Sequence, residues 1–234
     1  MTNVFIEGTT LLFNKPLAWT SADITRKVHA VLKRHLQVKK IKVGHAGTLD
    51  PMATGLVIVC TGKHTKTIDS IQAKEKEYIA VLKLGETTPS FDLETDVDFK
   101  FEISHITEES INQALKSFLG KQKQKPPQYS AKRVGGKRAY EFARKGEEVE
   151  LKLADIEIYN IEVLEFDTPK LKIKINCSKG TYIRSLARDI GLALNSGAYL
   201  IELIRTKIGE FDLNKATSIN DFEKNLTIIE QFNK

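Results

Sequence analysis

Apolar residues recur along the chain at two spacings, and each spacing predicts one kind of element. Between residues 24 and 36 they repeat every three or four positions, as on one face of a helix. The preceding Thr20-Ser21-Ala22-Asp23 is a capping-box sequence and predicts where this helix begins. Similar patterns predict further helices over Thr65–Ile71, Thr107–Leu119, Arg138–Lys145, Thr181–Leu194 and 218–234.

Alternating or continuous short apolar runs predict strands. These runs cover Thr10–Phe13, Leu56–Cys60, Tyr78–Leu84, Asp155–Phe166, Lys170–Cys177 and Ala198–Ile208. Asp167-Thr168-Pro169 separates two of the runs and predicts a hairpin. Helices mixed with hairpin neighbours favour an α+β fold, with a mixed, largely antiparallel central sheet flanked by helices.

Three segments interrupt this pattern. Residues 44–55 are rich in Gly and Thr and predict an ordered loop, residues 86–104 are acidic and irregular, and Lys121–Pro127 reads as a basic connector. Within Thr107–Leu119, the predicted buried stripe consists of Ile111, Leu115 and Leu119.

Charge is segregated along the chain. The net charge is +6, residues 26–42 hold seven cations and no acid, and residues 121–145 hold nine cations against Glu141 alone. Residues 86–109 are strongly acidic instead. Such a field can steer a phosphate backbone onto one face, although two solvated helix faces would give the same pattern.

Several function classes find no support. Cys60 and Cys177 lack metal or disulfide spacing, and the five histidines show no ligand motif. Nucleotide-binding glycine motifs and the G-x-S-x-G elbow are absent. No apolar run is long enough to span a membrane, and residues 1–10 lack the features of a signal peptide. We therefore expect a cytoplasmic protein that is not a metalloprotein, a nucleotide-binding protein or a serine hydrolase.

The most informative segment is the loop Gly44-His45-Ala46-Gly47-Thr48-Leu49-Asp50-Pro51. Its glycines allow tight backbone paths, and Pro51 biases Asp50 toward extended conformations. A carboxylate is thus held on a stiff loop before a buried strand. From the residues alone, Asp50 can be a turn cap or a catalytic group, and His45 can be an ordinary loop histidine.

This loop, followed by Ala53-Thr54-Gly55, resembles the signature of the TruB family of tRNA pseudouridine synthases. Four other segments resemble family motifs in order and spacing. They are Asn14-Lys15-Pro16 with Thr20-Ser21; Lys76-Glu77-Tyr78; Pro126-Pro127-Gln128-Tyr129-Ser130-Ala131 with Gly136, Tyr140, Ala143 and Arg144; and Cys177-Ser178-Lys179-Gly180-Thr181-Tyr182-Ile183-Arg184. Ala18-Trp19 and Lys132-Arg133 depart from the usual pattern in the entry loop and the RNA grip.

The resemblance implies a single catalytic domain of the pseudouridine synthase fold over residues 1–234. It would include an RNA-gripping insertion at 121–150 and lack the C-terminal PUA domain of many members. The implied activity is isomerisation of uridine 55 in the tRNA T loop, without cofactor or metal. The implied partner is the tRNA T arm, and we expect a monomer with no obligate protein partner and no membrane association.

The resemblance also assigns roles to individual residues. Asp50 would be the catalytic carboxylate, Arg184 would keep it ionised, and Tyr78 would stack under the flipped uracil. Whether Asp50 attacks C1′, attacks the base or removes a sugar proton stays open. The other expected substrate-binding residues are His45, Lys15, Lys66, Asp92, Tyr182, Tyr129, Lys132, Arg133 and Arg144. Of these, Asp92 would join Arg184 and Asp50 in one charge network.

Two rival functions remain at this point. One is a non-catalytic tRNA-binding or tRNA-folding factor of the same family. The other is an RNA-guided relative that modifies ribosomal RNA together with protein partners. Release of tritium from uracil C5 without partners would distinguish the stand-alone enzyme from both.

Overall fold

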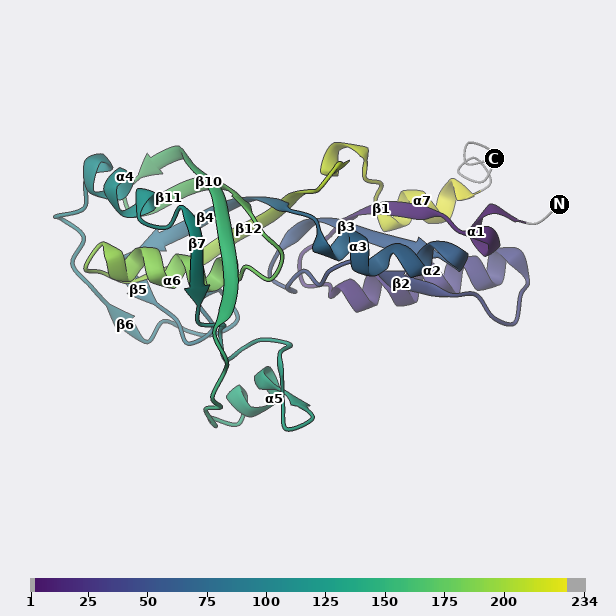
Figure 1. The fold of residues 1–234 in the computed structure, drawn as a ribbon, viewed down its shortest axis with the longest axis horizontal. Coiled ribbons are helices and arrows are strands. Elements are labelled where there is room, and N and C mark those ends of the chain that lie inside the picture. Colours follow the sequence, from purple (N-terminus) through teal and green to yellow (C-terminus); the bar gives the residue numbers. More distant parts are fainter. Residues whose placement is uncertain (1–2, 227–234) are drawn as a thin grey trace. The chain divides into compact units, whose positions relative to one another are not determined.

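The computed structural model describes residues 3–226, which form two compact units. The first unit comprises the residues up to Tyr78 together with those from Ile204 onward, and the second comprises Ile79–Leu203. Two strands, β4 (Lys76–Leu84) and β12 (Ala198–Ile208), contribute residues to both units (Figure 1). The prediction of a single catalytic domain stays a prediction.

The first unit is built around the buried strand β3 (Thr54–Thr61). Strand β1 (Thr10–Lys15) runs antiparallel to it, from the pair Thr10 with Cys60 to the pair Lys15 with Gly55. Strand β2 (Val43–His45) is also antiparallel to β3, and the end of β12 is parallel to it. The remaining elements are α1 (Val4–Glu7), α2 (Ser21–Leu36), η1 (Gly62–Thr67), α3 (Ile68–Ala73), β13 (Phe211–Asp212), η2 (Leu213–Lys215) and α7 (Ile219–Lys224).

Helix α2 begins where its sequence predicts. The Thr20 hydroxyl accepts from the Asp23 amide at 3.0 Å, and the Asp23 carboxylate accepts from the Thr20 amide at 2.8 Å, which completes the capping box. The apolar face buries Ile24, Val28, Val31 and Leu32. The helix ends at Gln37, which adopts a left-handed conformation with φ of 53°.

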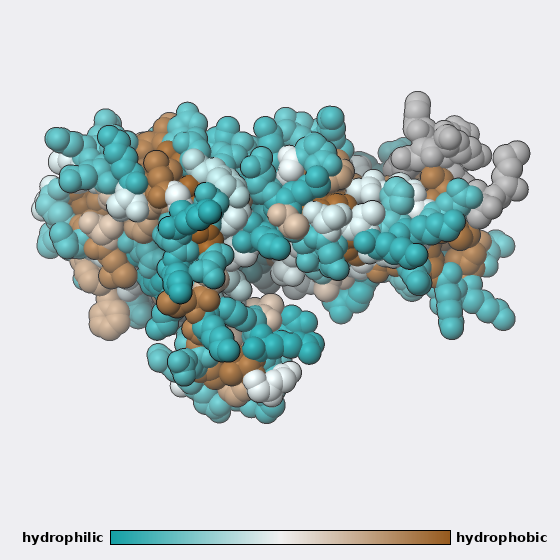
Figure 2. Space-filling view, viewed as in Figure 1, coloured by the Kyte–Doolittle hydropathy of each residue, from teal (hydrophilic) through white to brown (hydrophobic). Residues whose placement is uncertain are grey.

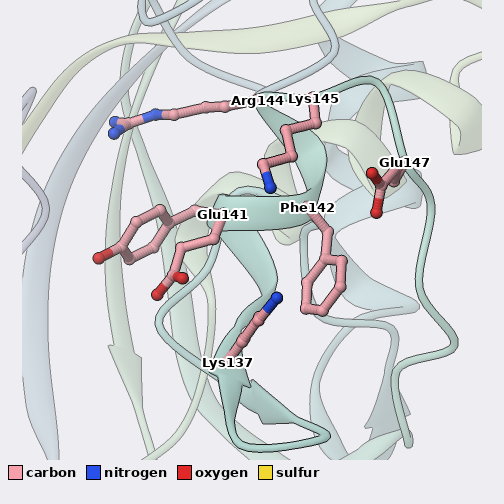
Figure 3. Close-up of a pocket in the computed structure, with 7 residues that line it drawn as sticks. Lys137, Glu141, Phe142, Arg144, Lys145 and Glu147 are labelled. Carbon is pink, nitrogen blue, oxygen red and sulfur yellow. The ribbon is translucent and has the colours of Figure 1, made fainter.

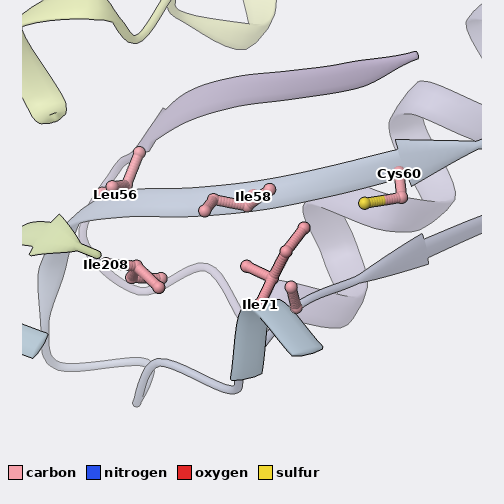
Figure 4. Packing of buried hydrophobic residues seen from close by; sticks show 6 residues of the cluster. Leu56, Ile58, Cys60, Ile71 and Ile208 are labelled. Carbon is pink, nitrogen blue, oxygen red and sulfur yellow. The ribbon is translucent and has the colours of Figure 1, made fainter. Parts of the chain in front are cut away.

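A compact apolar cluster fills the other side of β3. Figure 4 shows Leu56, Ile58 and Cys60 of the strand close to Ile71 of α3 and Ile208 of β12, with which they form one cluster. Each is 5% exposed or less. Burying a large aliphatic side chain contributes about 1.5–3 kcal/mol, so this cluster fixes β3 firmly.

The second unit is a sheet with helices and a protruding segment. Its strand order is β12, β4, β11, β10 and β7, and β10 and β11 form the predicted hairpin across Asp167–Lys170. The elements are β5 (Glu86–Thr87), β6 (Phe99–Lys100), α4 (Glu108–Lys116), β7 (Gly120–Gln124), β8 (Arg133–Val134), β9 (Lys137–Arg138), α5 (Ala139–Ala143), β10 (Ala154–Asp167), β11 (Lys170–Cys177) and α6 (Ile183–Ala193). The segment around α5 extends away from this sheet in Figure 1.

The predicted α+β class is confirmed, as are all six strands and most helices. Three predictions are wrong in detail. Gly44 and His45 belong to β2 rather than to a loop. Most of the predicted connector Lys121–Pro127 is part of a strand, because Gly120–Gln124 forms β7 and pairs with β10. Leu119 is 47% exposed because α4 ends at Lys116, one turn earlier than predicted.

Two helix predictions are confirmed in part. The helix predicted over Thr65–Ile71 is divided between η1 and α3. In the segment predicted as helical over 218–234, α7 is helical, and residues 227–234 lie outside the described part. None of the helices between residues 3 and 226 has both the length and the apolar character needed to cross a bilayer.

Candidate active site

Asp50 lies in the loop that connects β2 with β3. The chain turns directly after it, because the Ala53 amide donates to the Asp50 carbonyl oxygen at 3.1 Å. The carbonyl oxygen of Pro51 accepts from the Ala18 amide at 2.9 Å, which ties this turn to the loop before α2. The Asp50 residue is half-buried. A carboxylate is thus presented on a short turn whose main chain is fixed.

Arg205 on β12 holds this loop from the sheet side. It is only 1% exposed, and its guanidinium makes three hydrogen bonds to main-chain carbonyls. Nε donates to Leu56 at 2.8 Å, Nη1 to Thr48 at 3.1 Å and Nη2 to Gly47 at 3.2 Å. An arginine suits this position because its planar fork fixes several acceptors at once and keeps its charge when buried.

Ser21 holds the same loop from the helix side. Its hydroxyl accepts from the Leu49 amide at 2.9 Å and lies 3.4 Å from the Leu49 carbonyl oxygen, to which it donates. Both residues are buried, and Ser21 is the first residue of the capped helix α2. The residue directly before Asp50 is therefore anchored to a rigid helix terminus.

Lys15, at the end of β1, is fully buried below the loop. Its ammonium donates to the carbonyl oxygens of Pro16 at 3.0 Å, Trp19 at 2.6 Å and Pro51 at 3.3 Å. These three bonds use all three ammonium hydrogens and tie Lys15 to the Asp50 turn, and the expected contact of Lys15 with an RNA phosphate stays a prediction. Burial lowers the pKa of Lys15 to about 8, and the Asp50 carboxylate opposes that shift.

His45 and Lys66 occupy different settings in the same unit. His45 ends β2 and is half-buried, and burial lowers the pKa of its imidazole. Its Nδ1 is buried without a hydrogen-bond partner among the described residues. Lys66 is exposed on η1, as a phosphate-binding lysine requires.

Tyr78 is buried on β4, with 8% of its surface exposed. Its neighbour Glu77 accepts a hydrogen bond from the Thr206 hydroxyl at 2.8 Å, which fixes the start of β4 against β12. A stacking role for Tyr78 under a uracil ring stays a proposal.

Asp92 and Arg184 form a buried ion pair in the second unit. Arg184 Nε lies 3.5 Å from Asp92 Oδ2, and the two side chains are 5% and 7% exposed. Arg184 Nη1 also donates to the Ser90 carbonyl oxygen at 3.3 Å. The sequence expectation that Asp92 accompanies Arg184 therefore agrees with the geometry. Asp50 lies in the first unit, so its expected proximity to Arg184 stays a prediction.

The loop that carries Asp92 is tightly organised. The main-chain carbonyl of Asp92 accepts from the hydroxyls of Thr88 at 2.8 Å and Ser90 at 3.2 Å. Oδ1 of Asp92 accepts from the Glu94 amide at 2.9 Å. Phe91 has φ of 61°, a conformation that costs a non-glycine residue roughly 1–2 kcal/mol. That strain persists because the surrounding hydrogen bonds determine the loop, and it aims the Asp92 carboxylate at Arg184.

Arg184 is placed by the start of α6. The Gln124 side chain, at the end of β7, accepts from the Tyr182 amide at 2.8 Å and donates to the Tyr182 carbonyl at 3.1 Å. The Ser185 hydroxyl donates to the Lys125 carbonyl at 2.8 Å. These contacts fix the N-terminal turn of α6 to β7, and they hold Tyr182 half-buried beside Arg184.

The predicted RNA-gripping residues lie on the segment around α5. It is closed at its base by Gln128, whose amide donates to the Val149 carbonyl at 2.9 Å and accepts from the Val149 amide at 3.3 Å. The tip is the β8–β9 hairpin, where Gly135 and Gly136 supply the two positive φ angles that a two-residue turn requires. Figure 2 shows apolar side chains among hydrophilic ones around this segment.

The cations of this segment differ in availability. Arg133 is exposed, Lys132 donates to the Lys152 carbonyl at 2.7 Å, and Tyr129 is half-buried. Arg144 donates to Glu94 at 2.7 Å, and its guanidinium lies 5.1 Å from the centre of the Tyr140 ring. The hydrogen bond to Glu94 raises the pKa of Arg144.

A small pocket lies beside these cations. Figure 3 shows Lys137, Phe142 and Lys145 around it, with Arg144 directed away from Lys137. Lys137 Nζ lies 5.9 Å from the centre of the Phe142 ring, a separation at which a cation is attracted to an aromatic face.

The structure thus brings Lys15 to the Asp50 turn, and Asp92 to Arg184. Arg205 and Ser21, which hold the Asp50 loop, were missed by the sequence reasoning. A single arginine inside an apolar strand and a serine within a capping box give no signal of a distant partner. Between residues 3 and 226, no three His, Cys, Asp or Glu side chains gather as a metal-binding group. The expectation of no cofactor stays a prediction.

Comparison with family models places this chain among RNA-modifying proteins. The model of the TruB family pseudouridylate synthase N-terminal domain matches residues 33–183. The model of the tRNA pseudouridylate synthase B C-terminal domain matches residues 184–233. Together the two matches include Asp50, Asp92, Arg184 and Arg205.

Whole-chain relatives give the same result. The chain is 59% identical over 231 residues to tRNA pseudouridine synthase B of Parabacteroides distasonis, covering 97% of this chain and 98% of the relative. It is 56% identical over 218 residues to the protein of the same name from Phocaeicola vulgatus, covering 93% of each.

Among solved structures, it resembles a protein of an H/ACA ribonucleoprotein bound to a substrate RNA containing 2′-deoxyuridine. The TM-score is 0.68 at 26% identity. The match covers 98% of this chain but only 57% of the length of that protein.

Proposed function

Because the chain belongs to the TruB family of pseudouridylate synthases, we propose that it isomerises uridine 55 in the T loop of tRNA to pseudouridine. The observation that carries the proposal is the near full-length identity to relatives named tRNA pseudouridine synthase B. The geometry of the Asp50 turn supports it, since Lys15, Ser21 and Arg205 together fix the main chain around the half-buried Asp50.

The reaction breaks the bond between C1′ and N1 of the nucleoside, turns the uracil, and joins C1′ to C5. N1 gains a proton, and the hydrogen of C5 leaves to solvent, so the product is an isomer of the substrate. The enzyme must stabilise positive character at the sugar and retain a detached base. Asp50 is the proposed carboxylate, which can act on the sugar electrostatically or by attack.

The remaining site residues would assist this chemistry. A flipped uridine costs a few kcal/mol to extrude, and stacking on Tyr78 would return about 1–3 kcal/mol. The Asp92–Arg184 pair would supply a guanidinium already oriented by a buried carboxylate. His45 and Tyr182 would contact the nucleotide or its neighbours, and Lys66 would contact a backbone phosphate.

The protruding segment would hold the T arm. Its cations Lys132, Arg133 and Arg144 lie on or next to the β8–β9 hairpin and α5, where they can meet loop RNA from outside the sheet. We expect the protein to act as a monomer in the cytoplasm without an obligate protein partner.

The proposal is tested with a tRNA that carries tritium at uracil C5. The purified chain alone should release the label from the T loop, and mapping should place pseudouridine at position 55. Asp50→Asn should lower release by at least about 1,000-fold while leaving tRNA affinity within about twofold.

A matched control comes from a neighbouring acidic residue. Asp69→Asn on α3 removes a carboxylate from the same unit and should leave release unchanged. Tight tRNA binding without any release by the wild-type chain would favour a binding factor instead. Release that needs a guide RNA and partner proteins would favour an RNA-guided enzyme.

A further inference from the structure

Five lysines from two separate segments line one groove of the first unit. We define the lysine groove by Lys39, Lys40, Lys42, Lys63 and Lys66. The first three follow α2, and the last two lie on η1. All five are exposed, and no acidic side chain lines the groove. The charged side chains that the groove presents to solvent are therefore all positive.

These charges are not compensated within the protein. Between residues 3 and 226, none of the five groove lysines forms an ion pair. Two cations of α2 differ, since Lys27 and Arg34 both pair with Glu223, the former at 2.6 Å. Lys27 and Arg34 are thus neutralised, whereas the cations of the groove remain available.

The backbone holds the two lysine segments side by side. Val43 pairs with Thr61, and the Gly62 amide donates to the Lys42 carbonyl at 3.0 Å. Gly62 has φ of 52°, and a Cβ there would lie 2.2 Å from the Ile6 carbonyl oxygen. Only glycine permits this close approach of η1 to Ile6, and the hydrogen bond from Gly62 to Lys42 sets the spacing between the two lysine segments.

Strand β3 relates the lysine groove to the Asp50 loop within one unit. The groove adjoins Thr61, His45 pairs with Val59, and the Asp50 loop leads into Thr54. A strand rises about 3.3 Å per residue, so the two ends of β3 are separated by about 23 Å. A ligand that fills both places must be a polymer rather than a single nucleotide.

The side chains of the groove select for phosphate rather than for bases. Single-stranded nucleic acid is commonly held by aromatic side chains on which bases stack. Within the described part of the chain, His29 contributes the only ring that lines the groove, so the groove offers charge with little stacking surface. A helical RNA stem presents phosphates outward and hides its bases, and this matches the groove.

We propose that the lysine groove binds the phosphate backbone of the duplex stem that carries the substrate loop. The proposal rests on the proposed function, because it assumes that the loop of the same RNA reaches Asp50. The groove would supply affinity and orientation at a distance from the chemistry. Removing its charge should therefore weaken RNA binding without slowing the step on bound RNA.

The test uses T-arm hairpins with the native stem, hairpins with the stem extended at its open end, and full-length tRNA. Lys39→Gln/Lys40→Gln/Lys42→Gln/Lys63→Gln should weaken binding of the extended hairpin by about 10- to 100-fold at 0.15 M salt. The slope of log affinity against log salt should fall by about 3, close to one unit for each lost phosphate contact. Single-turnover tritium release at saturating RNA should be unchanged.

A charge-matched pair of variants provides the control. Lys39→Gln/Lys40→Gln removes two groove cations, and Lys27→Gln/Arg34→Gln removes two cations of α2 that pair with Glu223. The first should weaken binding several-fold more than the second. Circular dichroism should show that both remain folded, since every substituted side chain is at the surface.

Three results would overturn the proposal. One is an equal loss of affinity in the two double variants. Another is slower single-turnover tritium release by the quadruple variant at saturating RNA, which would place the lysines in the chemical step rather than in binding of the stem. The third is a loss confined to full-length tRNA, which would place the contact outside the T arm. Failure of the proposed function is separate, because then the wild-type chain would release no tritium however tightly it bound RNA.

Discussion

Arg205 and Thr48 are joined by a hydrogen bond of 3.1 Å between the guanidinium and a main-chain carbonyl oxygen, two residues before Asp50. The same guanidinium reaches Gly47 and Leu56. A buried cation therefore fixes the entry and the exit of the loop that presents the carboxylate. This arrangement makes Arg205 a positioning residue, since it acts on the reaction through the loop.

Substitution of Arg205 should separate positioning from folding. Arg205→Lys keeps the charge but cannot span all three carbonyls, and each buried acceptor left unsatisfied costs about 1–3 kcal/mol. We expect a lower melting temperature and a kcat reduced about 100-fold, with KM within threefold. Kinetics measured well below the melting temperature would show this split. A kcat that stays at the wild-type value in folded Arg205→Lys would refute the positioning role.

Lys15 should give the reaction a pH limit. Its pKa is lowered to about 8, so the ammonium loses its proton as pH rises through that value. The Pro51 carbonyl then loses a donor, and Asp50 loses a nearby positive charge. We expect single-turnover rates to fall above about pH 8.

The control for this limit is Lys15→Met, which has similar volume and no charge. Its rates should be lower at every pH and should lack the descending limb near pH 8. An unchanged limb in this variant would assign the titration to another group.

The folding stability of the wild-type chain should change with pH in the opposite direction to the rate. Between pH 8 and 10.5 the unfolded state holds the proton that the folded state has lost, so stability rises with pH.

Local pattern was sufficient for much of this fold. The capping box at Thr20 and the apolar repeat that follows it predicted α2, and alternation predicted the β10–β11 hairpin. Strand β7 was missed because Gly120–Gln124 has only polar side chains and glycine, and its pairing with β10 gives it its structure. Pairing with a neighbouring strand thus gives strand structure to a segment whose local pattern predicts a linker.

Some features of the candidate site could likewise be predicted from the sequence, and others could not. Asp50 could be identified because the Gly-rich loop and Pro51 mark it in the sequence. The resemblance to the family motif then favours a catalytic role for Asp50 over a turn cap. The burial of Lys15 could not be predicted from the sequence, because a lysine after an apolar run usually lies at the surface. Its carbonyl partners come from Pro16, Trp19 and Pro51, and only folding brings the last of them near.

The Asp92–Arg184 pair gives a stability prediction. Both side chains are almost fully buried, so Asp92→Asn would remove the carboxylate that lies 3.5 Å from Arg184 Nε. Breaking a buried pair in this way costs about 3–5 kcal/mol. Denaturant unfolding should show a loss of this size. Asp96→Asn, which removes an exposed carboxylate from the same loop region, should change stability by less than about 0.5 kcal/mol. Equal stability of the two variants would show that the buried pair contributes little.

Glu94 and Arg144 give a prediction about RNA binding. The carboxylate pairs with the arginine at 2.7 Å, although the two side chains are 28% and 60% exposed. An exposed pair of this kind is worth at most about 1 kcal/mol, so a phosphate can displace Glu94 at small cost. Glu94→Gln removes that competition. It should tighten tRNA binding about two- to fivefold at low salt and make the affinity fall more steeply with salt.

A double-mutant cycle tests whether the effect passes through Arg144. Arg144→Gln alone should weaken tRNA binding, and adding Glu94→Gln to it should produce no further change, because the competing carboxylate then has no cation to occupy. Glu147→Gln, which removes an acidic residue from the same protruding segment, is the matched control and should leave the affinity close to that of the wild type. If Glu94→Gln tightens binding equally with and without Arg144, its effect is a general reduction in repulsion, and the pair does not regulate the grip.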